Sequence, residues 1–177
     1  MKPDEATLVK ECLKHDQKAC RQLYDSYAPQ MLGICMRYAR SREAAEDILH
    51  DGFIKVFEQL HKLRDTSQLS AWIRSVMVNT ALSNYRHERS VEAVTDTIDD
   101  DAFFYANDEI YGSIDVEVIL RYVQQLPTAY RMAFNLVEIE GYSFTEAAKK
   151  LDIGESTVRS NFFRARKILA KQLSELL

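Results

Sequence analysis

The sequence has 177 residues, of which 46% are hydrophobic and 28% charged, so it can bury one large core or two small ones. Its five glycines and three prolines are too few for a turn-rich all-β protein. It contains neither a signal-peptide pattern nor a run of about 18 apolar residues. We therefore expect a mostly helical, cytoplasmic protein.

The formal net charge of −4 is unevenly distributed along the chain. Residues 91–113 hold seven acidic and no basic side chains, whereas the segments on either side are slightly basic. The overall charge therefore does not exclude a nucleic-acid partner. We interpret residues 91–113 as a flexible acidic linker. A metal or catalytic site at Asp99–Asp101 is less favoured, because neither histidine nor a glycine loop accompanies these acids.

The N-terminal segment predicts two helices. Residues 4–15 form the first, and Pro29 is expected to kink or restart the second. The three cysteines lack CxxC spacing, which indicates buried or free thiols. A zinc site at Cys12, His15 and Cys20 is the alternative, but this set lacks a fourth ligand.

A third helix is predicted over residues 41–60. Six residues of this segment fall on one side and predict its buried stripe: Ala45, Leu49, Phe53, Val56, Phe57 and Leu60. The opposite side combines acids with one branched apolar residue, and its members are Glu43, Asp47, Asp51, Ile54 and Glu58. Such a face suits docking of a basic protein partner, and a solvated acidic face with a stray isoleucine is the alternative.

A polar loop, residues 61–68, precedes a predicted helix over residues 69–89, which Thr66 or Ser67 is expected to cap. The exposed side of this helix gathers cations and an aromatic ring: Arg74, Tyr85, Arg86 and Arg89. This combination can follow a phosphate backbone while stacking an unpaired base. An ordinary solvated helix end is the alternative.

Further helices are predicted over residues 114–125 and 126–140, with Pro127 in the first turn of the latter and Gly141 after its end. Ser143 and Glu146 then form a capping-box pattern, which predicts a short helix. Gly154 is expected to allow the corner that follows and to serve as the N-cap of the last helix.

The last helix has two distinct sides. Its predicted buried stripe comprises Val158, Phe162, Ala165, Leu169, Leu173 and Leu176. The opposite side carries no carboxylate and comprises Ser156, Arg159, Ser160, Phe163, Arg164, Lys167 and Lys171. The pattern favours a helix-turn-helix whose second helix approaches base edges and phosphates, and a merely solvated basic face is the alternative.

The order of these parts resembles the extracytoplasmic-function (ECF) subgroup of sigma-70 family RNA polymerase sigma factors over nearly the whole chain. The segment AAEDILHDGFIKVF, residues 44–57, resembles the second helix of region 2. The segment SAWIRSVMVNTALSNYRHER resembles the adjoining part, with Trp72, Asn79 and Arg86 matching. Residues 126–169 resemble region 4 and its lead-in helix.

The resemblance implies an all-α protein in which a region 2 domain, residues 1–90, and a region 4 domain, residues 114–177, are joined by the linker. It implies that the acidic face of residues 41–60 docks on core polymerase. It also implies contacts with the promoter minus-ten element by His61, Lys62, Arg64, Arg74, Tyr85, Arg86 and Arg89. The minus-thirty-five element would be read by Ser156, Thr157, Arg159, Ser160, Phe163, Arg164 and Lys167.

Three positions depart from the usual pattern of the family. Asn161 stands where a basic residue is frequent, Phe163 is bulky for a position facing DNA, and His50 replaces a usual glutamine. Asn161 is suited to reading adenine and Phe163 to contacting a thymine methyl group.

The predicted function is therefore promoter-specific initiation of transcription, with core RNA polymerase and promoter DNA as partners and an anti-sigma factor as a further possible partner. A conventional helix-turn-helix regulator that acts without polymerase is the alternative. No nucleophile–base pair, phosphate loop or metal set indicates an enzyme or a cofactor.

Overall fold

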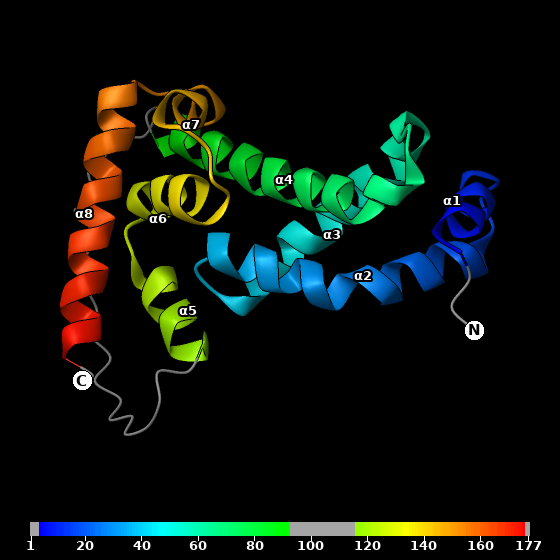
Figure 1. Ribbon diagram of the computed structural model, residues 1–177, viewed down its shortest axis with the longest axis horizontal. Helices are drawn as coiled ribbons and strands as arrows, with labels where there is room; N and C mark the ends of the chain where they lie inside the picture. The colour runs from blue at the N-terminus through cyan, green and yellow to red at the C-terminus, as the bar shows by residue number, and fades with distance from the viewer. Residues whose placement is uncertain (1–3, 93–115, 176–177) are drawn as a thin grey trace. The chain divides into compact units, whose positions relative to one another are not determined.

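The computed structural model describes residues 4–92 and 116–175, and every regular element among them is a helix (Figure 1). The all-α prediction is thereby confirmed. The chain divides into two compact units, Met1–Ala81 and Leu82–Leu177, and the division falls within helix α4, Leu69–Glu92. The predicted linker lies outside the described residues, apart from Val91 and Glu92 at the end of α4.

The first unit begins with a helical hairpin. Helix α1, Glu5–Leu13, is followed by α2, Gln17–Tyr38, whose N-cap Asp16 accepts a hydrogen bond from the Ala19 N–H at 2.8 Å. Pro29 was expected to kink or restart the helix, and no restart occurs, because α2 runs through this residue without a break. Pro29 is exposed, so the carbonyl that loses its N–H partner lies on the side of the helix that water can reach.

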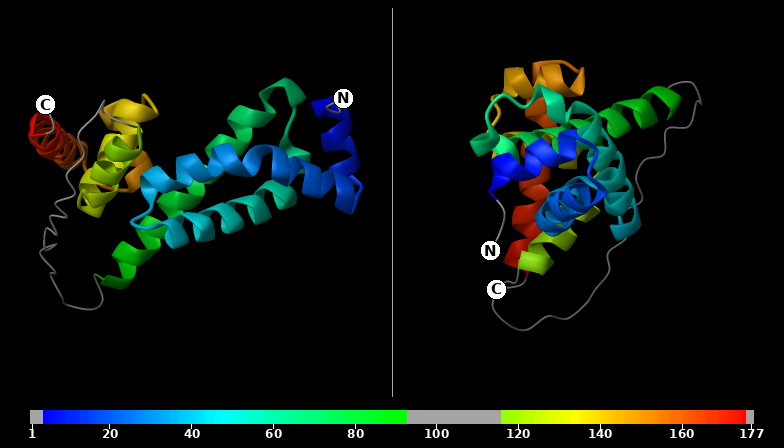
Figure 2. Two further views of the ribbon diagram at one scale, coloured as in Figure 1. Left: turned by 90° about the horizontal axis from the view of Figure 1, so that it is seen from below. Right: turned by 90° about the vertical axis from the view of Figure 1, so that its right-hand side faces the viewer.

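Helix α3, Arg42–Gln59, packs beside α2, and both views in Figure 2 show the two helices side by side. Its N-cap Ser41 accepts a hydrogen bond from the Ala44 N–H at 3.2 Å. The predicted stripe is buried except for Phe57, which is half-buried. The cap expected at Thr66 or Ser67 was wrong: Asp65 caps a 3₁₀ turn, Thr66–Gln68, that continues directly into α4.

A glycine allows α3 and α4 to approach closely. A Cβ atom added to Gly52 would overlap the Met77 sulfur and would lie 2.9 Å from the Met77 Cε atom. The Met77 side chain is fully buried, so it has little room to move away. The flexible methionine therefore fills the space that a missing methyl group leaves.

The second unit comprises α5, Val116–Gln125, α6, Thr128–Phe134, α7, Phe144–Leu151, and α8, Glu155–Ser174. The helix expected over residues 126–140 forms as one continuous helical segment over residues 128–139. Pro127 is the N-cap of α6 rather than a first-turn residue, and the helix widens into a π-helical turn, Asn135–Ile139. Gly141 follows with a left-handed φ of 77°, which fits its predicted place after the helix end.

A buried arginine joins α5 to α6. Arg131 is only 2% exposed, and its Nη1 atom donates to the carbonyl oxygens of Gln124 and Leu126 at 2.8 and 2.9 Å. Gln124 lies in the last turn of α5 and Leu126 directly follows the helix, where a cation also interacts favourably with the helix dipole. Residue patterns do not indicate this burial, because the carbonyl partners belong to the backbone of the preceding segment.

We predict that Gly52→Ala lowers the free energy of unfolding by about 1–3 kcal/mol, because the added methyl group overpacks the core against Met77. Met77→Ala alone should also destabilise, because it leaves a cavity. The double variant should be more stable than the sum of the two changes predicts, since each removes the other's defect. Urea unfolding of all four proteins measures this coupling, and simple additivity would contradict the proposed close approach.

Candidate nucleic-acid interface

Helices α7 and α8 form the predicted helix-turn-helix. The capping box is confirmed: the Ser143 hydroxyl accepts from the Glu146 N–H at 3.2 Å, and the Glu146 carboxylate accepts from the Ser143 N–H at 2.9 Å. Gly154 is the N-cap of α8, as expected, but its φ of −67° is ordinary. The left-handed corner residue is instead Asp152, with φ of 55°, a conformation that aspartate tolerates better than most residues.

Helix α8 buries one side and exposes the other. Val158, Phe162, Ala165 and Leu169 are buried as predicted, Leu173 is half-buried, and Leu176 lies outside the described residues. The seven residues predicted to face the minus-thirty-five element are all exposed, and so is Lys171. The seven are Ser156, Thr157, Arg159, Ser160, Phe163, Arg164 and Lys167.

Asn161 does not belong to this exposed side. It is only 8% exposed, whereas Phe163 is 54% exposed. The proposed reading of adenine by Asn161 therefore has no accessible side chain to support it. The Phe163 ring is held by two others, with its centroid 5.4 Å from that of Phe162 and 6.3 Å from that of Phe144.

Contacts with other helices orient two of the exposed arginines. The Arg164 Nη1 atom donates to the Tyr130 hydroxyl on α6 at 3.2 Å, and the guanidinium lies 5.9 Å from the centre of that ring. Arg159 donates to the Glu155 carboxylate at 2.9 Å, and its guanidinium lies over the Phe144 ring of α7 at 4.3 Å. The i,i+4 spacing of Glu155 and Arg159 was visible in the sequence, but the contributions of Tyr130 and Phe144 were not.

A second exposed face lies on α3. The predicted docking residues Glu43, Asp47, Asp51, Ile54 and Glu58 are all exposed, and Ile54 is 57% exposed. Hydrogen bonds from its own backbone N–H and from the Ser41 hydroxyl hold the pKa of Glu43 below its usual range. This carboxylate therefore remains ionised near neutral pH, so the face presents negative charge around an apolar side chain.

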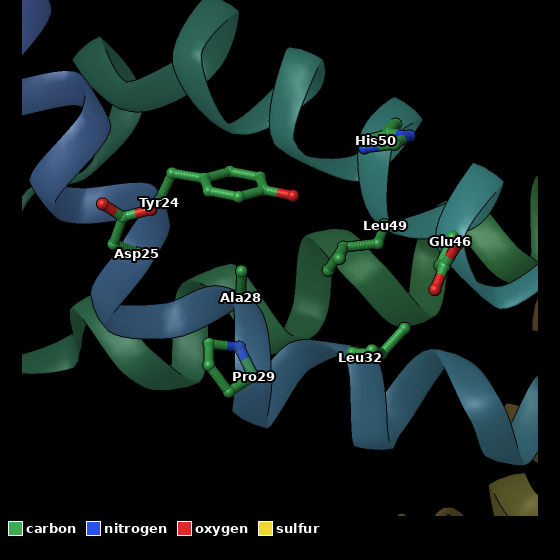
Figure 3. Close-up of a pocket in the computed structure, with 8 residues that line it drawn as sticks. All are labelled: Tyr24, Asp25, Ala28, Pro29, Leu32, Glu46, Leu49 and His50. Carbon is green, nitrogen blue, oxygen red and sulfur yellow. The ribbon is translucent and has the colours of Figure 1, made fainter. Parts of the chain in front are cut away.

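A pocket of about 460 Å³ lies between α2 and α3, and sequence reasoning did not find it. Figure 3 shows Tyr24, Ala28, Pro29 and Leu32 from α2 facing Leu49 and His50 from α3, with Asp25 and Glu46 at its edge. His50 lies between Asp47 and Asp51 along the chain, so the pocket borders the acidic face of α3. The sequence pattern did not indicate this pocket, because its lining combines residues from two different helices.

A third set of predicted residues lies on and after the loop that follows α3. His61, Lys62 and Arg64 are exposed there, and α1 packs against the 3₁₀ turns, Leu60–Lys62 and Thr66–Gln68, on either side of Arg64. The remaining members lie on α4. Arg86 is exposed, Arg74 is half-buried, and Arg89 is half-buried with its guanidinium 5.9 Å from the centre of the Tyr85 ring.

The zinc alternative finds no support within residues 4–92 and 116–175. No three histidine, cysteine or acidic side chains among them are placed to hold a metal ion, and Cys12, Cys20 and Cys35 are free thiols. None of the helices in these ranges is long and apolar enough to cross a membrane.

Exposed cations on the second helix of a helix-turn-helix are typical of DNA-binding proteins that act in transcription, and the fold and this surface place the chain in that class. Two family models match it: "Sigma-70 region 2" over residues 23–91 and "Sigma-70, region 4" over residues 117–169.

Relatives of similar length support the same assignment. The chain is 30% identical to the ECF RNA polymerase sigma-E factor of Escherichia coli (strain K12), with 96% of this chain and 94% of that protein covered. It is 29% identical to the RNA polymerase sigma-H factor of Pseudomonas aeruginosa, with the same coverage. Among solved structures, the sigma factor RpoE in complex with the anti-sigma factor NepR from Bartonella quintana shares the fold. Its TM-score is 0.52, its identity is 24%, and 87% of this chain and 96% of that chain are covered.

The chain belongs to the sigma-70 family of RNA polymerase sigma factors, in the ECF subgroup. It is therefore a transcription initiation factor that binds core RNA polymerase and directs it to specific promoters.

We predict that Arg164→Ala and Lys167→Ala each weaken binding of upstream promoter duplex. Each change should also reduce the slope of log affinity against log salt by about 1, because one phosphate contact and its released counterion are lost. Filter binding of the polymerase holoenzyme over a range of salt concentrations measures both quantities. Arg121→Ala, which removes an exposed arginine from α5, is the control. Wild-type affinity and slope in both variants would contradict a DNA-facing role for this side of α8.

Proposed function

We propose that the exposed side of α8 reads the minus-thirty-five element in the major groove. The observation that carries this assignment is that all seven predicted residues are exposed while four residues of the opposite stripe are buried: Val158, Phe162, Ala165 and Leu169. Short hydroxyl side chains and Arg159 near the start of α8 can reach base edges, and Arg164 and Lys167 further along suit phosphates. A helix held in this way presents one surface to the groove.

The acidic face of α3 is the proposed docking site for core polymerase. Its carboxylates attract a basic partner surface, and exposed Ile54 offers apolar area at the centre of the contact. The pocket beside His50 extends this face toward α2, where it provides room for a partner side chain. The carboxylates then steer association, and the burial of Ile54 contributes affinity.

The loop after α3 and the side of α4 that carries Tyr85, Arg86 and Arg89 are proposed to bind the minus-ten element and to promote melting. A flipped base requires a pocket or ring to stack on, and cations on the same helix can hold the displaced strand. His61, Lys62 and Arg64 supply the loop side chains, and Tyr85 with Arg86 and Arg89 supply a ring and charges on α4.

The sequence-based limits of the domains remain part of the proposal. Residues 1–90 would act on polymerase and the minus-ten element, residues 114–177 on the minus-thirty-five element, and residues 91–113 would join them. The protein would act in the cytoplasm without catalysing a reaction of its own. An anti-sigma factor is a proposed partner, because the solved RpoE structure of the same fold is bound to one.

Transcription in vitro tests the proposed recognition of two promoter elements together with core polymerase. Purified protein is mixed with sigma-free core polymerase and genomic DNA, and transcript starts are mapped. New starts that share two spaced upstream elements would support it. Sequence-specific duplex binding without binding to core would instead favour a conventional helix-turn-helix regulator.

We predict that Asp51→Arg and Ile54→Asp each weaken binding to core polymerase while the protein stays folded. The first reverses the charge that attracts a basic surface, and the second places a charge where apolar area becomes buried. We expect a loss of at least tenfold in affinity, about 1.4 kcal/mol, measured by competition with a labelled sigma factor.

Matched controls lie at the two ends of α1, in the same unit. Asp4→Arg makes the same charge change, and Leu13→Asp replaces a side chain that is 45% exposed. If the α3 variants bind core as well as these controls do, the docking face lies elsewhere.

A further inference from the structure

The first turn of α8 carries a carboxylate that links both helices of the helix-turn-helix. The Thr145 hydroxyl, in the first turn of α7, donates to Glu155 Oε2 at 2.8 Å. The Arg159 Nη2 atom donates to Glu155 Oε1 at 2.9 Å. Glu155 therefore uses both carboxylate oxygens, one toward α7 and one toward a residue on its own helix.

Arg159 is held on a second side by an aromatic ring. Its guanidinium lies 4.3 Å from the centre of the Phe144 ring, and that ring packs edge-on against the buried Phe162 at 5.4 Å. The Arg159 side chain nevertheless remains 51% exposed. A guanidinium has five N–H donors in a fixed planar fork, so most of them remain available to a ligand.

The charge of Glu155 persists at neutral pH. The hydrogen bond from Thr145, and next the one from Arg159, keep the pKa of this carboxyl below its usual range. The Glu155 side chain is 45% exposed at the N-terminal end of α8, the end of the helix that approaches DNA in a helix-turn-helix. An anion at this position repels phosphates on any sequence, so it lowers general affinity for DNA.

We propose that Glu155 is a positioning residue that orients Arg159 for base reading and, by its charge, disfavours non-specific duplex. The proposal rests on the proposed role of α8 at the minus-thirty-five element. An arginine reads guanine through two parallel hydrogen bonds, whose geometry depends on the direction of the guanidinium plane. Holding that plane before binding reduces the conformational entropy lost on binding. Glu155 thereby lowers the overall affinity for DNA and increases the discrimination between base sequences.

The replacement Glu155→Gln removes the charge and keeps nearly the same shape. Exposed ion pairs contribute modestly, so discrimination between a selected and a scrambled upstream duplex should fall about two- to fivefold. Binding to the scrambled duplex should become tighter, because one repelled charge has gone. A merely structural role would lower thermal stability and weaken both duplexes alike.

Two further variants separate position from charge. Glu155→Asp keeps the charge but is one methylene too short to span Thr145 and Arg159, so it should lose discrimination without gaining affinity for scrambled duplex. Glu175→Gln removes an exposed carboxylate beyond the other end of α8 and should change neither quantity.

The experiment selects upstream duplexes from a random pool with holoenzyme assembled from core polymerase and the full-length chain, and compares base preferences at each position. Glu155→Gln should flatten preference at the same positions as Arg159→Ala, and the double variant should be no worse than Arg159→Ala. If Glu155→Gln flattens preference at other positions, or leaves preference unchanged, the positioning role is overturned.

If Arg159→Ala itself changes no preference, the reading of DNA by Arg159 fails, and the role of Glu155 fails with it. If Arg159→Ala flattens preference and Glu155→Gln does not, only the inference about Glu155 is lost.

Discussion

Burial of a single apolar stripe on α8 is the constraint on which the DNA-facing surface depends. Ala165 and Leu169 pack with Val123 and Leu126 of the preceding segments, while Val158 and Phe162 are buried further toward the start of the helix. Because a helix has 3.6 residues per turn, burying this stripe fixes the direction of every other side chain on α8. The basic residues therefore face outward as a consequence of packing, and α6 and α7 act as the support that holds them there.

Charge is arranged so that different helices present opposite signs to their surroundings. Helix α3 exposes carboxylates around Ile54, whereas the outer side of α8 exposes arginine and lysine. Such separation suits a protein that binds both a polyanion and another protein at different surfaces. The carboxylates of α3 repel DNA, and the cations of α8 repel a basic protein surface. Glu155 is the exception, and its ion pair with Arg159 is the basis for proposing that a single acid at the edge of a basic face contributes to selectivity.

Each error of the sequence-based prediction has a local cause. Pro29 did not interrupt α2 because its ring lies on the exposed side, where water can satisfy the carbonyl that it leaves unpaired. Gly154 was expected to allow the corner between α7 and α8, but the residue that adopts the left-handed conformation there is Asp152, and aspartate tolerates this conformation better than most residues. Residues 126–140 have a continuous helical pattern, and a pattern cannot show that the helix widens at Asn135.

The sequence alone determined the helical class, the capping box at Ser143, the two sides of α3 and α8, and the family, because these follow from local periodicity, capping chemistry and motif order. Tertiary structure decided the rest. Four features depend on residues that are distant along the chain or lie on different helices. They are the approach of Gly52 to Met77, the burial of Arg131, the pocket between α2 and α3 and the orientation of Arg159. Periodicity reports which side of one helix is buried but not which residue of another helix it meets, so these contacts had no signal in the order of residues.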